Sequence, residues 1–220
     1  MKTYFKTFVS SLLAGLFIGF AGLAFLLVSY LPNSSPLFGA LIFPFGLILV
    51  CLCKTDLFTG KIGFAFNDKE LTIIKLLIIL VGNLLAAFLF GLLGHFIFSK
   101  NQDLLAFTNN LVKIKTDILN ISSLTLFFKA TICGALVYLA VYLYKTIENH
   151  LLKIIGTYIP IFFFVLFGFD HCIANMFYFA FSFSFTPSMI LSLLIAIIGN
   201  SFGALVINFA FRFISLKTNS

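Results

Sequence analysis

The chain has 220 residues, of which 61% are hydrophobic, 10% are charged and 32 are phenylalanine. Soluble domains are about half apolar and about a quarter charged, so this composition excludes an ordinary soluble globule. The net charge of +7 comes from 14 Lys and Arg residues scattered between apolar runs. This pattern is typical of loops that flank membrane spans and not of a nucleic-acid groove. We therefore expect an integral membrane protein with no separate catalytic domain and no nucleic-acid partner.

Uninterrupted apolar runs predict six membrane spans. The first run, Phe8–Leu31, is too long for the hydrophobic region of a signal peptide, so we expect it to remain as the first span. The runs Leu37–Cys53 and Ile154–Phe169 are each followed by a short apolar piece, Leu57–Phe66 or Cys172–Phe185, too short to cross alone. We interpret these pairs as spans 2 and 5, each an interrupted helix. The other runs are Leu76–Phe98, Leu124–Tyr144, whose one charged residue is Lys129, and the stretch from the turn around Pro187 to Phe211.

Matching motifs in the two halves of the chain predict an internal repeat. Val81-Gly82-Asn83 recurs as Ile198-Gly199-Asn200, and Asp56 and Asp170 stand at the two helix breaks with nearly the same offset. The chain is then a single transmembrane domain, 1–220, with one repeat at about 1–110 and another at about 120–220. Because each repeat holds an odd number of spans, the second copy enters from the opposite side, as in inverted-repeat transporters.

The distribution of Lys and Arg predicts the orientation. Ten of the 14 residues fall on one side of the six spans and four on the other. By the positive-inside rule, we expect a multi-pass protein of the cytoplasmic membrane with both termini in the cytoplasm. The connection Ser99–Ser123 is then the one substantial external loop. The four externally placed residues are Lys100, Lys113, Lys115 and Lys129.

The strongest functional signal is the pair Asp170-His171 at the second break. An ionisable group at the centre of a span costs at least about 2.5 kcal/mol unless it faces a cavity or a partner. At the first break we expect Thr55 or Asp56 to cap the short helix, and Thr59 to offer its hydroxyl either to His171 or to its own preceding turn. Two helix N-termini that meet at membrane depth create a positive potential that favours a small anion.

Three Asn residues lie within spans. For Asn83 we expect a packing role between helices, whereas pore lining and packing remain alternatives for Asn175 and Asn200. The four Cys residues lie in apolar runs without a ligand spacing, and the chain has only three His residues. We therefore expect no metal, no cofactor and no enzyme active site.

Three segments resemble the signature segments of the formate/nitrite transporter family. They are Phe45–Val50 continuing to Asp56–Gly60, then Gly168–Phe177, and finally Gly199–Ala204. The resemblance covers nearly the whole chain, and its run G-F-[DE]-H-x-x-A-N-M-F is specific. It implies an all-α, aquaporin-like protomer of six spans, assembled as a homopentamer with one pore per protomer. It also implies passage of small monovalent acids such as formate, nitrite, hydrosulfide, acetate or lactate.

The resemblance implies roles for individual residues. His171 matches the family's central His and Thr59 the loop Thr that contacts it, while Asn175 and Asn200 match polar residues beside the pore. We assign the family's vestibule lysine to Lys115, with Lys113 as the alternative because the spacing to the fourth span is about three residues longer than usual. The implied constriction residues are Leu47 and Phe164 on the external side and Leu57, Phe58 and Val137 on the cytoplasmic side.

The sequence therefore predicts a channel or proton-linked carrier for a small weak-acid anion in the lipid bilayer. Basic vestibules gather the anion, apolar constrictions reject hydrated ions, and His171 acts as a proton donor or a pH-sensitive gate. The nearest alternative is a neutral-solute channel for water or a small polyol, and the more distant one is a membrane-embedded enzyme with Asp56, Asp170 and His171. Asp170 replaces the commoner Glu of the family, and Gly134 stands where an Asn is frequent, which leaves the substrate open.

Overall fold

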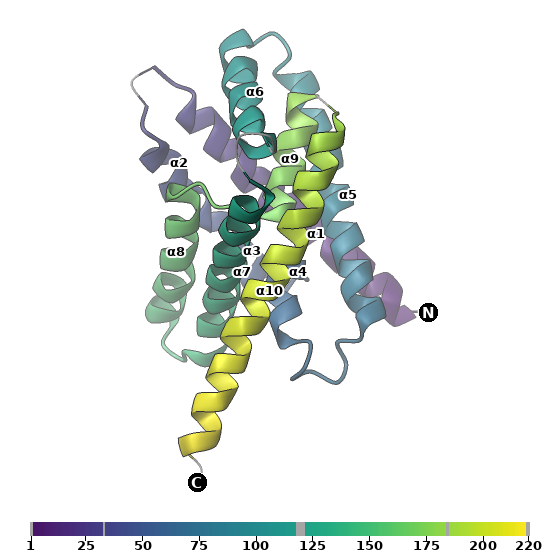
Figure 1. Cartoon of the computed structure of the whole chain (residues 1–220), viewed down its shortest axis with the longest axis vertical. Coiled ribbons are helices and arrows are strands. Elements are labelled where there is room, and N and C mark those ends of the chain that lie inside the picture. Colours follow the sequence, from purple (N-terminus) through teal and green to yellow (C-terminus); the bar gives the residue numbers. More distant parts are fainter. Residues whose placement is uncertain (1, 33, 118–121, 184, 219–220) are drawn as a thin grey trace.

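The computed structural model describes residues 2–32, 34–117, 122–183 and 185–218, and the regular elements in these ranges are all helical. They form one elongated bundle (Figure 1). In chain order the elements are α1 (Lys2–Ser29), α2 (Pro36–Ile42), α3 (Pro44–Leu52), α4 (Phe58–Lys61), the 3-10 turn η1 (Ile62–Phe64), α5 (Ile73–Ile97), α6 (Gln102–Thr116), α7 (Ser123–Thr146), α8 (His150–Leu166), α9 (Cys172–Ser182) and α10 (Pro187–Thr218).

Four helices of the described ranges, α1, α5, α7 and α10, are long and apolar enough to cross a membrane. Large apolar side chains such as Leu77, Leu89, Ile198 and Phe202 are exposed on their outer faces. A helix that is apolar on its outer face as well as on its packed face suits lipid and not water. The protein is therefore a membrane protein, as the composition predicts.

The shorter helices follow each other in two runs. In the first, Pro44 begins α3 directly after α2, and α3 is separated from α4 by a turn in which Lys54 has a φ of 54°. In the second, α8 is separated from α9 by a turn in which Gly168 has a φ of 66°. The short apolar pieces are shorter than expected, because α4 gives way to η1 after Lys61 and α9 ends at Ser182.

The connection expected to be a loop at Ser99–Ser123 contains a helix, α6. The side chain of Asn101 caps its first turn by accepting the backbone N–H of Leu104 at 3.0 Å. Leu104, Thr108 and Val112 follow at four-residue spacing and are buried, so one stripe of α6 packs on the bundle. The mixed polar composition of this segment concealed the stripe. The end of the predicted loop, residues 118–121, lies outside the described residues.

Two buried Asn side chains bind the starts of α4 and α9. Asn83 Oδ1 accepts the N–H of Phe58 at 2.7 Å, and Asn200 Oδ1 accepts the N–H of Cys172 at 2.9 Å. The prediction that Thr55 or Asp56 caps the first of these helices is wrong. The N-cap residue of α4 is Leu57, whose side chain accepts nothing, so Asn83 supplies the cap from a distant helix.

Close helix crossings bring these Asn residues to the helix starts. Gly15 of α1 faces the backbone of Asn83, and Gly134 of α7 faces the backbone of Asn200. A methyl group at either glycine would collide with the facing backbone, so only glycine permits these crossings. This explains why this chain needs Gly134 at the position where an Asn is expected.

The bundle has two distinct ends. In Figure 1 its upper end carries α6 and the start of α10. Its lower end carries the start of α1, the end of α10, the connection from η1 to α5 and the turn from α7 to α8. The starts of α4 and α9 lie between these ends. They are the place where the candidate site is built.

Candidate functional site

His171 and Thr59 meet in the interior of the bundle, although they are 112 residues apart in the sequence. His171 Nε2 lies 2.9 Å from Thr59 Oγ1, and the two residues are 2% and 0% exposed. His171 is the N-cap residue of α9, while Thr59 lies in α4. The alternative in which Thr59 bonds its own preceding turn is therefore not the observed arrangement.

The hydrogen bonds of the imidazole fix its tautomer. The backbone N–H of Ala174 donates to His171 Nδ1 at 3.2 Å, so Nδ1 is an acceptor and carries no proton. The ring is then neutral, with its proton on Nε2, and it donates that proton to Thr59 Oγ1. As the acceptor of this bond, the Thr59 hydroxyl keeps its own hydrogen for a further acceptor.

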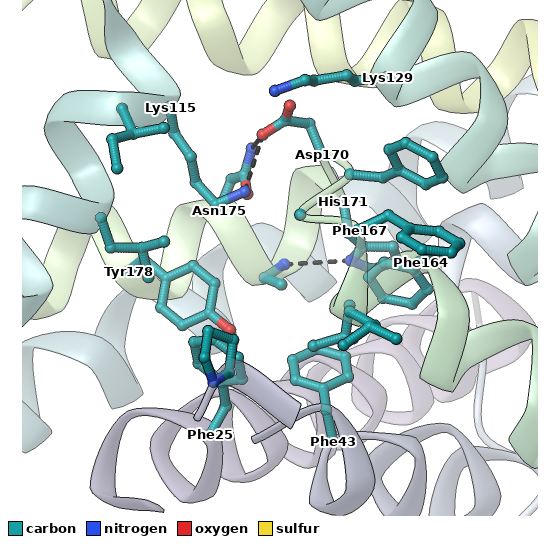
Figure 2. A pocket seen from close by; sticks show the side chains of 18 of the residues that line it. Phe25, Phe43, Lys115, Lys129, Phe164, Phe167, Asp170, His171, Asn175 and Tyr178 are labelled. Carbon is teal, nitrogen blue, oxygen red and sulfur yellow. Dashed lines mark hydrogen bonds and ion pairs between the residues drawn. The ribbon is translucent and has the colours of Figure 1, made fainter. Parts of the chain in front are cut away.

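Asp170 and Lys115 form a buried ion pair next to His171. Lys115 Nζ lies 2.9 Å from Asp170 Oδ1, and the side chains are 10% and 3% exposed. Asn175 Nδ2 donates to the same oxygen at 3.1 Å (Figure 2). Lys113, the alternative for the vestibule lysine, is exposed on α6 and does not reach the site. The structure thus brings Lys115 to the predicted place, but pairs it with Asp170 instead of leaving its charge free.

The upper cavity, which has a volume of about 360 Å³, lies above this cluster and is lined by Lys115, Asp170, His171 and Asn175. It also contains a lysine that the sequence analysis did not assign, Lys129 of α7. Figure 2 shows its ammonium group directed towards the Asp170 carboxylate. A single charge inside a long apolar run was the signal that could have identified it.

Two residues that line the upper cavity each have one buried polar atom without a hydrogen-bond partner among the described residues. These atoms are Ser29 Oγ and Asn175 Oδ1. Buried polar groups without a partner are costly, because they have lost water without regaining a hydrogen bond. Asn175 therefore belongs to the lining, whereas Ser29 is a candidate that sequence reasoning missed.

Phe164 lines the upper cavity next to His171. Its ring stacks on the imidazole with centroids 5.8 Å apart, and it also makes an edge-on ring contact with Phe43 at 5.6 Å. Leu47 of α3 is buried but does not line the upper cavity. Phe43, which lies between α2 and α3, lines this cavity and makes the ring contact with Phe164, whereas Leu47 does not line it.

A second cavity, the lower cavity, lies at the opposite end of the bundle and has a volume of about 310 Å³. Leu57, Gly60 and Val141 form part of its wall. The other two predicted cytoplasmic constriction residues, Phe58 and Val137, are buried and lie outside this lining. The buried layer of Leu57, Thr59 and His171 therefore stands between the two cavities.

Asn83 and Asn200 use their amides on the backbone. Asn200 Nδ2 donates to the carbonyls of Ala130 and Asp170, both at 2.8 Å, in addition to its bond with Cys172. Asn200 is fully buried and lines neither cavity, so the packing alternative describes its geometry. The role of Asn83 goes beyond the packing expected for it, because its side chain hydrogen-bonds to the backbone of Asp56 and Phe58 at the first helix break.

Metal ligands do not gather in the described part of the chain. No three His, Cys, Asp or Glu side chains among these residues are close enough to hold a metal ion. Cys133 and Cys172 are buried beside the site as free thiols.

Comparison with known proteins identifies the family. A sequence model described as formate/nitrite transporter matches residues 1–214. The chain belongs to the formate/nitrite transporter family. The resemblance noted in the signature segments is thereby confirmed, and the site with His171 and Thr59 is a site in a membrane transport protein.

Curated relatives of this family member are themselves transporters or channels. A probable formate transporter of Methanothermobacter thermautotrophicus is 32% identical over 204 residues, which cover 79% of this chain and 73% of the relative. A formate channel of Bacillus thuringiensis is 32% identical over 188 residues, with 74% and 70% covered. An uncharacterized transporter of Bacillus subtilis (strain 168) is 31% identical over 219 residues, with 87% and 80% covered.

Solved structures match the fold of this family member. A pentameric formate channel with formate bound superimposes with a TM-score of 0.73 at 25% identity, covering 99% of this chain and 97% of that chain. An FNT family ion channel superimposes with a TM-score of 0.80 at 24% identity, covering 96% and 90%. The all-helical fold is therefore that of known channels of the family.

Proposed function

We propose that the protein conducts small monovalent anions or their weak acids, of the class that includes formate, nitrite, hydrosulfide, acetate and lactate. The observation that carries this proposal is the contact between His171 and Thr59, which joins two helix breaks between two cavities. Relatives named as formate transporter and formate channel support formate as the first substrate to test.

The two cavities approach the same buried layer from opposite ends. Lysines line both cavities, and in the lower cavity, whose lining contains no acidic residue of the described chain, they attract an anion. Phe164 and Leu57 oppose a hydrated ion because stripping its water is costly. A small weak acid passes such a layer most easily when its charge is balanced by a proton. The Thr59 and His171 hydrogen bond lies where that proton is needed, and we infer that His171 supplies it.

We further propose six spans in an inverted repeat. The four long helices supply four spans, and the runs α2 to α4 and α8 to α9 supply two interrupted ones. The equivalent hydrogen bonds of Asn83 and Asn200 support the repeat, with halves at about 1–110 and 120–220. Non-helical backbone at membrane depth is tolerated where it is packed in protein or lines a cavity, and both breaks meet that condition.

A solved structure and the distribution of charge support an assembly and an orientation. We infer a homopentamer with one pore in each protomer, because a pentameric formate channel shares the fold over nearly the whole chain. The ten Lys and Arg residues on the side of the termini support a cytoplasmic location of the lower end, in the cytoplasmic membrane.

A flux assay in liposomes tests the proposed function. Purified protein in vesicles should pass formate and nitrite faster than protein-free vesicles and should leave glycerol at the protein-free rate. Rapid glycerol entry without formate entry would contradict the proposal and would identify a neutral-solute channel. Equal rates for every solute with and without protein would reject transport by the protein alone.

A further inference from the structure

The two cavities differ in the charges that line them. Two lysines and two aspartates line the upper cavity: Lys115, Lys129, Asp117 and Asp170. Four lysines and no acidic residue of the described chain line the lower cavity: Lys54, Lys61, Lys145 and Lys153. The upper lining is therefore balanced in formal charge, whereas the lower lining is strongly positive.

Among the described residues, only one of the four lower lysines forms an ion pair with a carboxylate. Lys61 Nζ lies 2.9 Å from Asp56 Oδ1. In the described part of the chain, Lys54, Lys145 and Lys153 have no carboxylate oxygen within 4.0 Å. These three lysines therefore have no directly paired counterion, although Asp56 and Asp68 attract Lys145 from a longer range. Like charges around one cavity repel each other, so an anion that enters the cavity is stabilised.

Aromatic rings hold two of these lysines near the cavity. Lys145 Nζ lies 3.8 Å from the centroid of the Phe64 ring, and Lys153 Nζ lies 5.1 Å from that of Tyr144. Such contacts are worth about 0.5–1 kcal/mol at exposed sites, less than a buried counterion would provide. The two ammonium groups are therefore kept in place but remain available to an anion.

The backbone at Lys54 supports a role for its side chain. Lys54 has a φ of 54°, the left-handed conformation in which glycine is the usual residue directly after a helix. A lysine accepts strain here that a glycine would avoid. Its side chain lines the lower cavity together with those of Lys145 and Lys153.

The inner wall of the lower cavity favours retention of a doubly charged ion. Leu57 and Val141 belong to this wall and are both buried. A monovalent anion becomes neutral when it takes up one proton. A divalent oxyanion that takes up one proton still carries a negative charge and cannot enter an apolar layer. A divalent oxyanion also neutralises two of the three unpaired lysines at once.

We propose that the lower cavity is a binding site for a divalent oxyanion, with inorganic phosphate as its probe, and that the bound ion closes this end of the pathway. The binding site rests on the lysines alone. The closing effect rests on the proposed function, because it requires that small anions leave or enter through this cavity.

Direct binding tests the site without any transport measurement. Phosphorus NMR or calorimetry of the purified protein in phosphatidylcholine nanodiscs should detect saturable phosphate binding. Lys145→Gln combined with Lys153→Gln should weaken it by roughly tenfold or more, since each lost charge removes part of the attraction. Lys69→Gln is the matched control, because Lys69 is exposed at the same end of the bundle and lies outside the lining. Absence of saturable binding by the parent, or equal binding by the double variant, would overturn the site.

A lipid headgroup could supply the same phosphate chemistry, and membrane composition separates the two sources. The binding assay is repeated in nanodiscs that contain phosphatidylglycerol. Phosphate binding in phosphatidylcholine alone supports a soluble oxyanion. If inorganic phosphate does not bind, and the double variant differs from the parent only in its binding of phosphatidylglycerol, the lysines bind lipid and the proposal is wrong.

Formate flux tests the closing effect. Phosphate added at the lower end should slow formate flux through the parent and through Lys69→Gln, with ionic strength held constant by chloride. The double variant should lose this inhibition. Phosphate binding in a protein that passes no formate would overturn the proposed function and keep the site, whereas formate flux unaffected by saturating phosphate would remove the closing effect.

Discussion

Asn83 and Asn200, 117 residues apart, make the same set of three hydrogen bonds. Each Oδ1 accepts the N–H that begins a helix, from Phe58 at 2.7 Å or from Cys172 at 2.9 Å. Each Nδ2 donates to one carbonyl in the turn before that helix and to one in a neighbouring long helix. A single amide thus joins three segments of the chain at each helix break.

Asn83→Ala should destabilise the fold. The substitution leaves the buried N–H of Phe58 and two carbonyls without partners, which should cost about 2–4 kcal/mol. Thermal unfolding in detergent should show a lower midpoint for Asn83→Ala and for Asn200→Ala. Asn109→Ala, on the exposed face of α6, is the control and should unfold at the parental temperature. Equal midpoints for all variants would show that the amide bonds contribute nothing to stability.

Lys115→Ala should reduce anion uptake most strongly at low salt. The substitution removes a positive charge from the upper cavity and leaves the Asp170 carboxylate without its ion-pair partner. Asp170→Asn in addition should restore part of the uptake, because it removes the unpaired negative charge. The measurement is formate uptake by liposomes over a range of ionic strength.

Lys113→Ala is the matched control for this prediction. Lys113 lies on the same helix but is exposed and outside the cavity lining, so its removal should leave uptake unchanged. A defect in Lys113→Ala with normal uptake by Lys115→Ala would transfer the vestibule role to Lys113.

Phe164→Ala should widen the upper side of the buried layer. Phe164 stacks on His171 and is 4% exposed, so its removal opens space beside the imidazole. We expect uptake of larger weak acids, or a leak of ions, and the same effect when Leu47→Ala is added. Phe163→Ala is the control, since Phe163 is 42% exposed on the same helix. Unchanged selectivity in Phe164→Ala would assign this ring to packing.

His171→Asn should abolish the pH dependence of formate or nitrite flux. Asn keeps a hydrogen-bonding side chain but cannot bind and release a proton, so a proton supplied by His171 is lost. Uptake by liposomes from about pH 5 to about pH 8 covers the range in which an imidazole titrates. A variant whose profile overlays that of the parent would show that His171 is structural.

Thr59→Val should shift that pH profile without erasing it. Valine removes the hydroxyl that accepts the Nε2 proton but leaves the imidazole able to titrate. The assembly of both variants is checked first, so that a lost oligomer is not mistaken for a lost proton path. A Thr59→Val profile identical to that of the parent would mean that the hydroxyl does not influence the proton on His171.

The purified protein should be a pentamer. Large apolar side chains cover the outer faces of the long helices, and a pentameric channel shares the fold. Native mass spectrometry in mild detergent measures the number of copies directly. A monomer or dimer under conditions that preserve transport would contradict the pentamer.

The sequence by itself determined that the protein lies in a membrane, because hydrophobic content and the length of apolar runs are properties of composition. It also located the helix breaks at Asp56 and Asp170, because charged and turn-forming residues interrupt apolar runs locally. The signature run Gly168–Phe177 predicted the family. These conclusions need only neighbouring residues along the chain.

Only the tertiary structure decided which residues form the site, because its contacts join distant segments. The pairing of Lys115 with Asp170, and not of Lys113, depends on which face α6 turns towards the bundle, and the sequence of that segment concealed the helix itself. The cap that Asn83 provides to α4, and the place of Lys129 in the upper cavity, likewise depend on how separate helices cross. Hydrogen bonds and ion pairs require separations near 3 Å, and helix packing sets such distances where local pattern cannot.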